Sequence, residues 1–231
     1  MLPVTWLKPQ VINGYSIISF CILELEGLTI WPLPTSLGLG TISCAYRCGV
    51  IDESQAAPIP SVFIVSRNTD RSIVSSMAPM FLRNAMPRVN TTISHAPNGT
   101  KIEAKYAGGS IMFTATVTAT EELEISRSRI FDTKDEFTEF IHDGVASYAH
   151  SIYPDSLTRV DLQKNDCNYT EVKADVDKFS TGTDWIDSEM IFDSSFRATG
   201  GGIYKWTYLG LAPICYDGAI QEIPCTLEIP Q

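Results

Sequence analysis

The side chains best suited to chemistry stand in one stretch, Ser61–Val89, where charged residues follow directly after apolar ones. The apolar run Ser61–Val65 continues into the polar turn Arg67–Arg71. A guanidinium can hold a carboxylate through two parallel hydrogen bonds, so an arginine at the end of a buried strand is a candidate anchor for an acid. The same charges could instead form a surface ion-pair cluster, which would contribute little. The sequence leaves both interpretations open.

A second arginine, Arg47, lies in the expected strand Thr41–Ile51, and the two faces of this strand differ. One face is apolar and is a packing face: Ile42, Cys44, Tyr46, Cys48 and Val50. The other face carries Arg47 among small residues. This second face is either exposed to solvent or forms the wall of a cavity in which small side chains leave room for a ligand. On neighbouring strands, Arg47 and Arg67 could bind one carboxylate together.

Two carboxylates and two further side chains complete the candidate site. Asp70 would orient an arginine, or carry a proton if it is buried. Glu24 would pair with one of the arginines, or else stand at a solvated strand end. The candidate catalytic residues are therefore Asp70 and Glu24. The candidate substrate-binding residues are Arg47, Arg67, Arg83 and Tyr46.

Other catalytic patterns are missing from the sequence. The histidines His95, His142 and His150 show no metal-binding spacing, so we predict neither a metal nor a cofactor. The chain has no G-x-S-x-G, and the glycine run at 200–202 lacks the Lys-Ser/Thr of a phosphate loop. The six cysteines are interpreted as free thiols, mostly buried. A secreted carrier with disulfide bonds is the alternative.

The overall composition excludes several classes of partner. The 231 residues carry a net charge of −10 without a cluster of Lys and Arg, which argues against binding to nucleic acid or to an anionic membrane surface. No apolar run approaches the roughly 20 residues needed to span a bilayer. No signal peptide is evident, so we expect a cytoplasmic protein with one domain, 1–231, and a small-molecule ligand. A homo-oligomer is left open.

Short alternating segments predict a mostly antiparallel β domain with one packed helix. The expected strands are Tyr15–Leu25, Thr41–Ile51, Ser61–Ser66, Lys101–Tyr106, Ser110–Thr120, Leu157–Gln163, Tyr169–Val176, Glu189–Phe196 and Ile203–Leu209. The one convincing helix is Asp132–Ala149, which begins with the capping-box spacing of Thr133 and Glu136. We expect 68–89 to be irregular or partly helical, because Pro79 and Pro87 prevent one long helix.

Several segments resemble, in the same order, an uncharacterised family within the acetoacetate decarboxylase-like superfamily. They are Asn13–Tyr15, Gly27–Pro34, Ala45–Arg47, Val62–Asp70, Phe137–Tyr148 and Arg159–Leu162. Of these, Val62–Asp70 is the strongest. The resemblance implies a mainly β (α+β) fold: a closed, cone-like antiparallel β-barrel with one or two packed helices and a pocket inside the barrel.

The resemblance also implies a class of chemistry, with one departure. Characterised relatives are decarboxylases and other lyase-type enzymes that act on small oxo acids, and many use a buried lysine as a Schiff-base nucleophile. The corresponding segment here, 72–100, contains no lysine, and its cations Arg83 and Arg88 cannot form an imine. Among the remaining lysines, Lys205 is the least implausible substitute. Two hypotheses follow: a lyase-type enzyme whose Arg47 and Arg67 hold an acid, or a binding module that has lost the activity.

Overall fold

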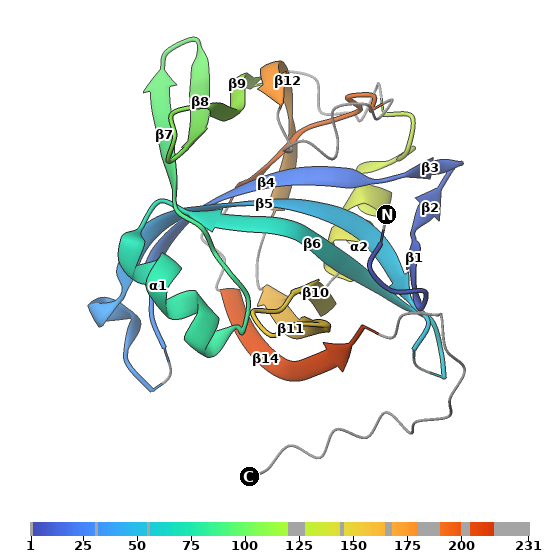
Figure 1. Cartoon of the computed structure of the whole chain (residues 1–231). Helices are drawn as coiled ribbons and strands as arrows, with labels where there is room; N and C mark the ends of the chain where they lie inside the picture. Colours follow the sequence, from blue (N-terminus) through green and yellow to red (C-terminus); the bar gives the residue numbers. More distant parts are fainter. Residues whose placement is uncertain are drawn as a thin grey trace.

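The computed structural model of the chain describes residues 2–30, 32–54, 56–119, 128–143, 146–164, 168–179, 190–199 and 204–214. Most of the secondary structure in these ranges is β-strand. The strands form two curled sheets, and the long strands β4 (Ile18–Leu28), β5 (Leu39–Asp52) and β6 (Ile59–Thr69) cross the centre of the molecule side by side (Figure 1).

The larger sheet has seven strands in the order β1-β5-β6-β10-β11-β14, with β4 also pairing β5. Its remaining strands are β1 (Leu7–Pro9), β10 (Ala146–His150), β11 (Ser156–Lys164) and β14 (Tyr204–Pro213). The sheet curls because β10, β11 and β14 turn beneath the three long strands (Figure 1). All its pairings are antiparallel except that of β6 with β10, which is parallel.

The second sheet has five antiparallel strands in the order β13-β12-β9-β8-β7. These strands are β7 (Val89–Ala96), β8 (Gly99–Tyr106), β9 (Ile111–Ala119), β12 (Asn168–Phe179) and β13 (Phe196–Thr199). Pro97 and Asn98 form the two-residue turn of the β7–β8 hairpin, and Gly99 begins β8. The short strands β2 (Val11–Ile12) and β3 (Tyr15–Ser16) form a separate ribbon.

The sequence predicted a closed antiparallel barrel, and this prediction is wrong because both sheets are open. In the described part of the chain, an isolated bridge between Thr69 and Arg88 links the end of β6 to the start of β7, and Thr69 N donates to Pro87 O (3.1 Å). The ladder cannot continue there because the chain leaves β6 into α1 (Ser72–Phe81) and returns only at Val89. The result is two curled half-barrels that face each other.

The helix predicted over Asp132–Ala149 is shorter than expected. Only α2 (Lys134–Asp143) is helical, and Ala146–His150 is the strand β10. The predicted cap is confirmed, since Thr133 Oγ1 accepts from Glu136 N (3.2 Å) and the Glu136 carboxylate accepts from Asp132 N (2.8 Å). Strand β10 lies between β6 and β11 and its first four residues are buried, which satisfies its backbone groups better than a continued helix would.

The prediction that 68–89 is partly helical, without one long helix, is confirmed by α1. This helix tolerates Pro79 because the proline stands in its last turn and the helix ends soon after it. One other segment differs from the sequence prediction. The strand expected over Glu189–Phe196 is not formed in its described part, 190–195, and β13 begins at Phe196. A single 3-10 turn, η1 (Thr35–Leu37), lies in the loop between β4 and β5. None of the described helices has the length and hydropathy to span a membrane.

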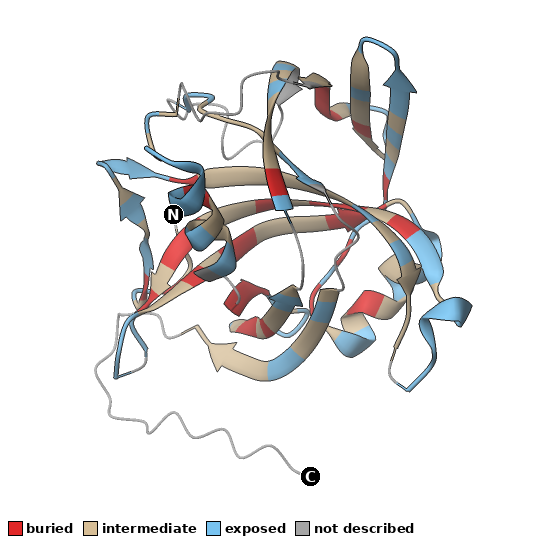
Figure 2. Cartoon of the chain, turned by 180° about the vertical axis from the view of Figure 1, so that it is seen from behind, coloured by how far each residue is buried: buried red, intermediate tan, exposed pale blue. Residues whose placement is uncertain are grey.

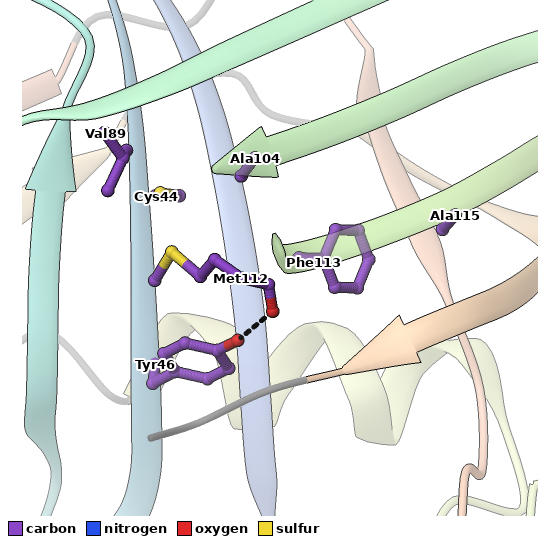
Figure 3. Packing of buried hydrophobic residues seen from close by; sticks show 7 residues of the cluster. All are labelled: Cys44, Tyr46, Val89, Ala104, Met112, Phe113 and Ala115. Carbon is purple, nitrogen blue, oxygen red and sulfur yellow. Dashed lines mark hydrogen bonds between the residues drawn. The ribbon is translucent and has the colours of Figure 1, made fainter. Parts of the chain in front are cut away.

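The buried side chains concentrate on the central strands (Figure 2). The cluster between the two sheets contains Cys44, Tyr46, Val89, Ala104, Met112, Phe113 and Ala115 (Figure 3). The predicted packing face of β5 is thus confirmed for Cys44, Tyr46 and Val50, all of which are buried. The opposite face of the same strand leads to the candidate site.

Candidate functional site

The face of β5 that carries Arg47 is the wall of a cavity. Thr41, Ser43, Ala45 and Arg47 all line an open cavity of about 2940 Å³, which is bordered by residues of both sheets and of both α-helices. This answers the question that the sequence leaves open, because Arg47 points into the molecule rather than to the outer solvent.

Arg67 reaches the same cavity through a β-bulge. Ala45 pairs with Arg67, but the register shifts between Tyr46 and Arg47, so that Arg47 pairs with Ile64. An extra residue in one strand reverses which side chains face inward beyond it. Both Ile64 and Arg67 therefore line the cavity. Strict alternation along β6 would have placed them on opposite faces.

The two guanidinium groups stand close enough to repel each other. Burial first, and then the neighbouring charge of Arg47, lower the pKa of Arg67 from 12.5 to about 10, although Cys21 acts in the opposite direction. Arg67 still keeps its proton at neutral pH. Its side chain is surrounded by protein yet remains in contact with the open cavity. The two guanidinium groups are thus a local concentration of positive charge, in a wide cavity that carboxylates also border: Glu24, Glu26, Glu171 and Asp193.

Neither arginine has an anionic partner among the described residues. The ion pairs formed there join Arg71 to Asp70 and Lys105 to Glu103. The Arg47 Nε atom is buried without a hydrogen-bond partner. An unpaired buried charge is costly, so an orphaned guanidinium that faces a cavity needs an explanation, and a bound anion would supply one.

A third cation, Lys164, lies beside this pair. It shares the interior face of β11 with Val160 and Leu162, and its Nζ donates to Ile141 O (2.9 Å) in α2. Lys164 and Arg47 line the same small recess next to Phe140. Sequence reasoning missed Lys164, although it follows Val160 and Leu162 at the same two-residue spacing and so could be assigned to the inward face.

Aromatic side chains form another wall of the cavity. Three residues of β14 line the cavity: Tyr204, Trp206 and Tyr208. They pair in this order with Lys164, Leu162 and Val160 of β11. The rings of Tyr204 and Trp206 stack with their centroids 5.9 Å apart. Lys205, the lysine least implausible for an imine, is exposed and also borders this cavity.

The structure does not bring Asp70 to the arginine pair. The Asp70 carboxylate accepts hydrogen bonds from Thr41 Oγ1 (2.8 Å) and Ile42 N (2.8 Å), so it fastens the turn before α1 to β5. Thr41 stands six residues from Arg47 along β5, about 20 Å in an extended strand. The nearest cation to the carboxylate is the exposed Arg71, at 3.8 Å. No ion pair joins Asp70 to Arg47 or Arg67 among the described residues, because its carboxylate is held by β5 and lies beside Arg71.

The other three candidates do not join the arginine pair. Glu24 borders the wide cavity, but it is exposed and pairs with Ile42, which places it on the face of β4 opposite to Cys21. Tyr46 belongs to the buried cluster between the sheets, where its hydroxyl donates to Met112 O (3.2 Å; Figure 3). Arg83 has a positive φ of 54° after α1, and its guanidinium donates to Tyr153 Oη (3.4 Å) at the surface.

The described residues contain no group of three or more His, Cys, Asp and Glu side chains that could hold a metal ion. Cys21, Cys44 and Cys48 are free thiols. The other three cysteines, Cys167, Cys215 and Cys225, lie outside the described residues.

Comparison with known proteins identifies the fold. No protein-family model and no curated protein matches the sequence. The structure is similar to acetoacetate decarboxylase from Legionella pneumophila, with a TM-score of 0.51, 10% identity, and coverage of 74% of this chain and 68% of that one. It is also similar to MppR, an enduracididine biosynthesis enzyme, with a TM-score of 0.54, 10% identity, and coverage of 91% and 79%.

The chain has the acetoacetate decarboxylase-like fold. The mainly β, acetoacetate decarboxylase-like fold implied by the segments around Val62–Asp70 is therefore confirmed, apart from the closed barrel, and identities of 10 to 12% reach no further than the fold.

Proposed function

We propose that the chain binds a small oxo or carboxylic acid in its cavity, with Arg47 and Arg67 as the groups that hold the carboxylate. The observation that carries this proposal is the pair of inward guanidinium groups, which have no anionic partner among the described residues. Arginine is the side chain best matched to a carboxylate, because its donors are planar and remain charged.

The structural neighbours support the class of ligand. MppR, which shares the fold, is described in complex with pyruvate, and pyruvate is a small oxo acid. The cavity here is large compared with the roughly 300–1,000 Å³ of ordinary ligand sites. Its aromatic wall on β14 gives an apolar part of the acid a surface to contact.

Lyase-type chemistry is the activity that this arrangement supports best. Loss of carbon dioxide from a 3-oxo acid, or loss of a proton from the carbon next to the keto group of any oxo acid, leaves an enolate, and fixed positive charges stabilise such a developing anion. Arg47, Arg67 and Lys164 supply these charges without an imine. A binding module without activity is the second hypothesis, and product formation separates the two.

Acid binding is tested by calorimetric titration of pyruvate into the wild-type protein and into Arg47→Gln and Arg67→Gln. Each variant is expected to bind about tenfold or more weakly, because a hydrogen bond to a charged group contributes about 1.5–3 kcal/mol. Lys101→Gln removes an exposed cation from β8 and is the matched control. Equal affinity in all four proteins would overturn the assignment of the arginines.

The absence of an imine is tested separately. Borohydride is added to the protein with pyruvate, and the intact mass is measured. We expect no covalent adduct. An adduct at Lys164 would show that this lysine is a Schiff-base nucleophile and would contradict this part of the proposal.

A further inference from the structure

The three described thiols lie in two different environments. Cys44 and Cys48 stand on the face of β5 opposite to Arg47, where burial raises the pKa of Cys44 to about 12 and that of Cys48 to about 11. Thiols of this kind react slowly because they are rarely ionised at neutral pH. Cys44 also borders the cavity but is only 1% exposed, whereas Cys21 on β4 is half-buried there and pairs with Ala45, on the face of Arg47.

Strand register places Cys21 in one row with Arg67. Cys21 pairs with Ala45, and Ala45 pairs with Arg67 on its other side. Because paired residues have Cα atoms about 5 Å apart, the Cα atoms of Cys21 and Arg67 are about 10 Å apart. Only the methyl group of Ala45 stands between them. The guanidinium can reach over this methyl group towards the sulfur, and the electrostatic effect of Cys21 on Arg67 agrees with this proximity.

Two observations on the arginines support a ligand site in front of this thiol. Arg67 has no hydrogen-bond or ion-pair partner among the described residues, although it lies within the protein. Arg47 leaves its buried Nε donor unused in the same cavity. A carboxylate held by these donors would bring the rest of its molecule against β4, where Cys21 stands.

We infer that Cys21 is a nucleophile of this site and reacts with electrophiles that carry a carboxylate, 2-oxo acids foremost. The inference rests on the proposed function, because the arginines hold the acid. The sulfur forms a bond to the keto carbon, and the electron pair of the C=O π bond moves to the keto oxygen. That oxygen takes the proton which the thiol has lost. The product is a thiohemiketal, and the reverse steps release the acid without any further reactant.

Selective alkylation tests the inference. The folded protein is treated with iodoacetate, which is anionic, or with iodoacetamide, which is neutral, and the rate at each cysteine is measured by peptide mass spectrometry. Relative to a free cysteine peptide, Cys21 should favour iodoacetate by about tenfold or more, because a positive cleft raises the local concentration of anions. Cys44 and Cys48 are internal controls and should remain unmodified. A Cys21 that is unreactive, or that shows the ratio of the free peptide, would overturn the inference.

Variants assign the selectivity to the arginines. Arg67→Gln and Arg47→Gln should return the ratio of rates at Cys21 towards that of the free peptide, whereas Lys101→Gln should not. Ala45→Leu places a larger side chain between Cys21 and Arg67 and should also lower the ratio. A ratio that stays high in both arginine variants would contradict the proposed geometry.

The covalent step has its own readout. With [2-¹³C]pyruvate, the wild-type protein should show a carbon-13 signal in the tetrahedral range, and Cys21→Ser should lack it. Pyruvate that binds in calorimetry without this signal and without selective alkylation would refute the role of Cys21 alone. Pyruvate that fails to bind the wild-type protein would refute the proposed function, and selective alkylation would still identify the thiol beside the cations.

Discussion

Replacing Arg67 with methionine should stabilise the protein while it removes acid binding. Methionine has a similar length and no charge, so it fills the same space without the cost of burying a cation next to Arg47. The lowering of the Arg67 pKa from 12.5 to about 10 corresponds to about 3 kcal/mol. Because the guanidinium also touches the open cavity, screening reduces the expected gain to about 1–3 kcal/mol.

The assay is urea unfolding of Arg67→Met, of the wild type and of Lys101→Met, each without added acid. The free energy of unfolding should rise in Arg67→Met by the stated amount, with a thermal midpoint about 2–4 °C higher per kcal/mol. Lys101→Met should change little, because its cation is exposed. Addition of pyruvate should stabilise the wild type but not Arg67→Met. A loss of more than about 1 kcal/mol in Arg67→Met would refute the view that this cation is unpaired.

Three further outcomes follow from other parts of the structure. Tyr148→Phe should lower the free energy of unfolding by about 1–3 kcal/mol, because the Tyr148 hydroxyl donates to the buried Asp52 carboxylate (2.5 Å). Urea unfolding measures this loss, and an unchanged value would mean that a water replaces the hydroxyl. Burial alone would raise the pKa of Asp52, but hydrogen bonds from Ser54 and Tyr148 outweigh it and lower the pKa. The stability that Asp52 contributes is therefore present above its unfolded pKa of about 3.9, and it is lost as the pH falls through the lower folded value. Thermal midpoints measured over this acidic pH range should vary less for Asp52→Asn than for the wild type. Gly38→Ala should destabilise the β4–β5 hairpin by about 1–3 kcal/mol, because an added Cβ would lie 2.2 Å from the backbone carbon of Gly27. If Gly38→Ala has the same thermal midpoint as the wild type, this close approach of the two glycines is not required.

The sequence predicts the long strands well because their patterns are local. Alternation along 41–51 separates the packing face of Tyr46 from the face of Arg47, and the structure bears out this division. The pattern could not decide whether the second face was a cavity or solvent, because that depends on strands far away in the sequence. The small residues around Arg47 were the available signal. They indicate that there is room beside the arginine, but not whether other strands enclose that room.

The errors in the site arise from features that only tertiary contacts create. The β-bulge in β6, opposite Tyr46 and Arg47, has no recognisable sequence pattern. The sequence could therefore suggest that Arg47 and Arg67 point to the same side, but it could not explain how the paired strands achieve this. Asp70 stands close to Arg67 in sequence, yet backbone and hydroxyl donors of β5 hold its carboxylate. Lys164 belongs to the site although about 100 residues separate it from the arginines in the sequence, as the spacing from Arg67 shows.

The misassigned strand β10 has a similar cause. Residues 146–150 follow a well-capped helix and contain alanine, which favours a helix in isolation. Pairing with β6 on one side and β11 on the other overrides this local preference. The assumption of a closed barrel failed for a related reason, because the break between β6 and β7 is set by α1.

The parallel pairing of β6 with β10 also sets the order in which the chain can complete its larger sheet. Ser61 pairs with Ala146, 85 positions later, and most of the smaller sheet is encoded between them. Contacts of such long separation form late, because closing the intervening loop costs entropy. During synthesis, β4, β5 and β6 leave the ribosome long before β10 exists, and the β6 edge then presents unpaired backbone groups. The half of the molecule that carries Arg47 and Arg67 is thus the half most prone to aggregate while the chain is incomplete.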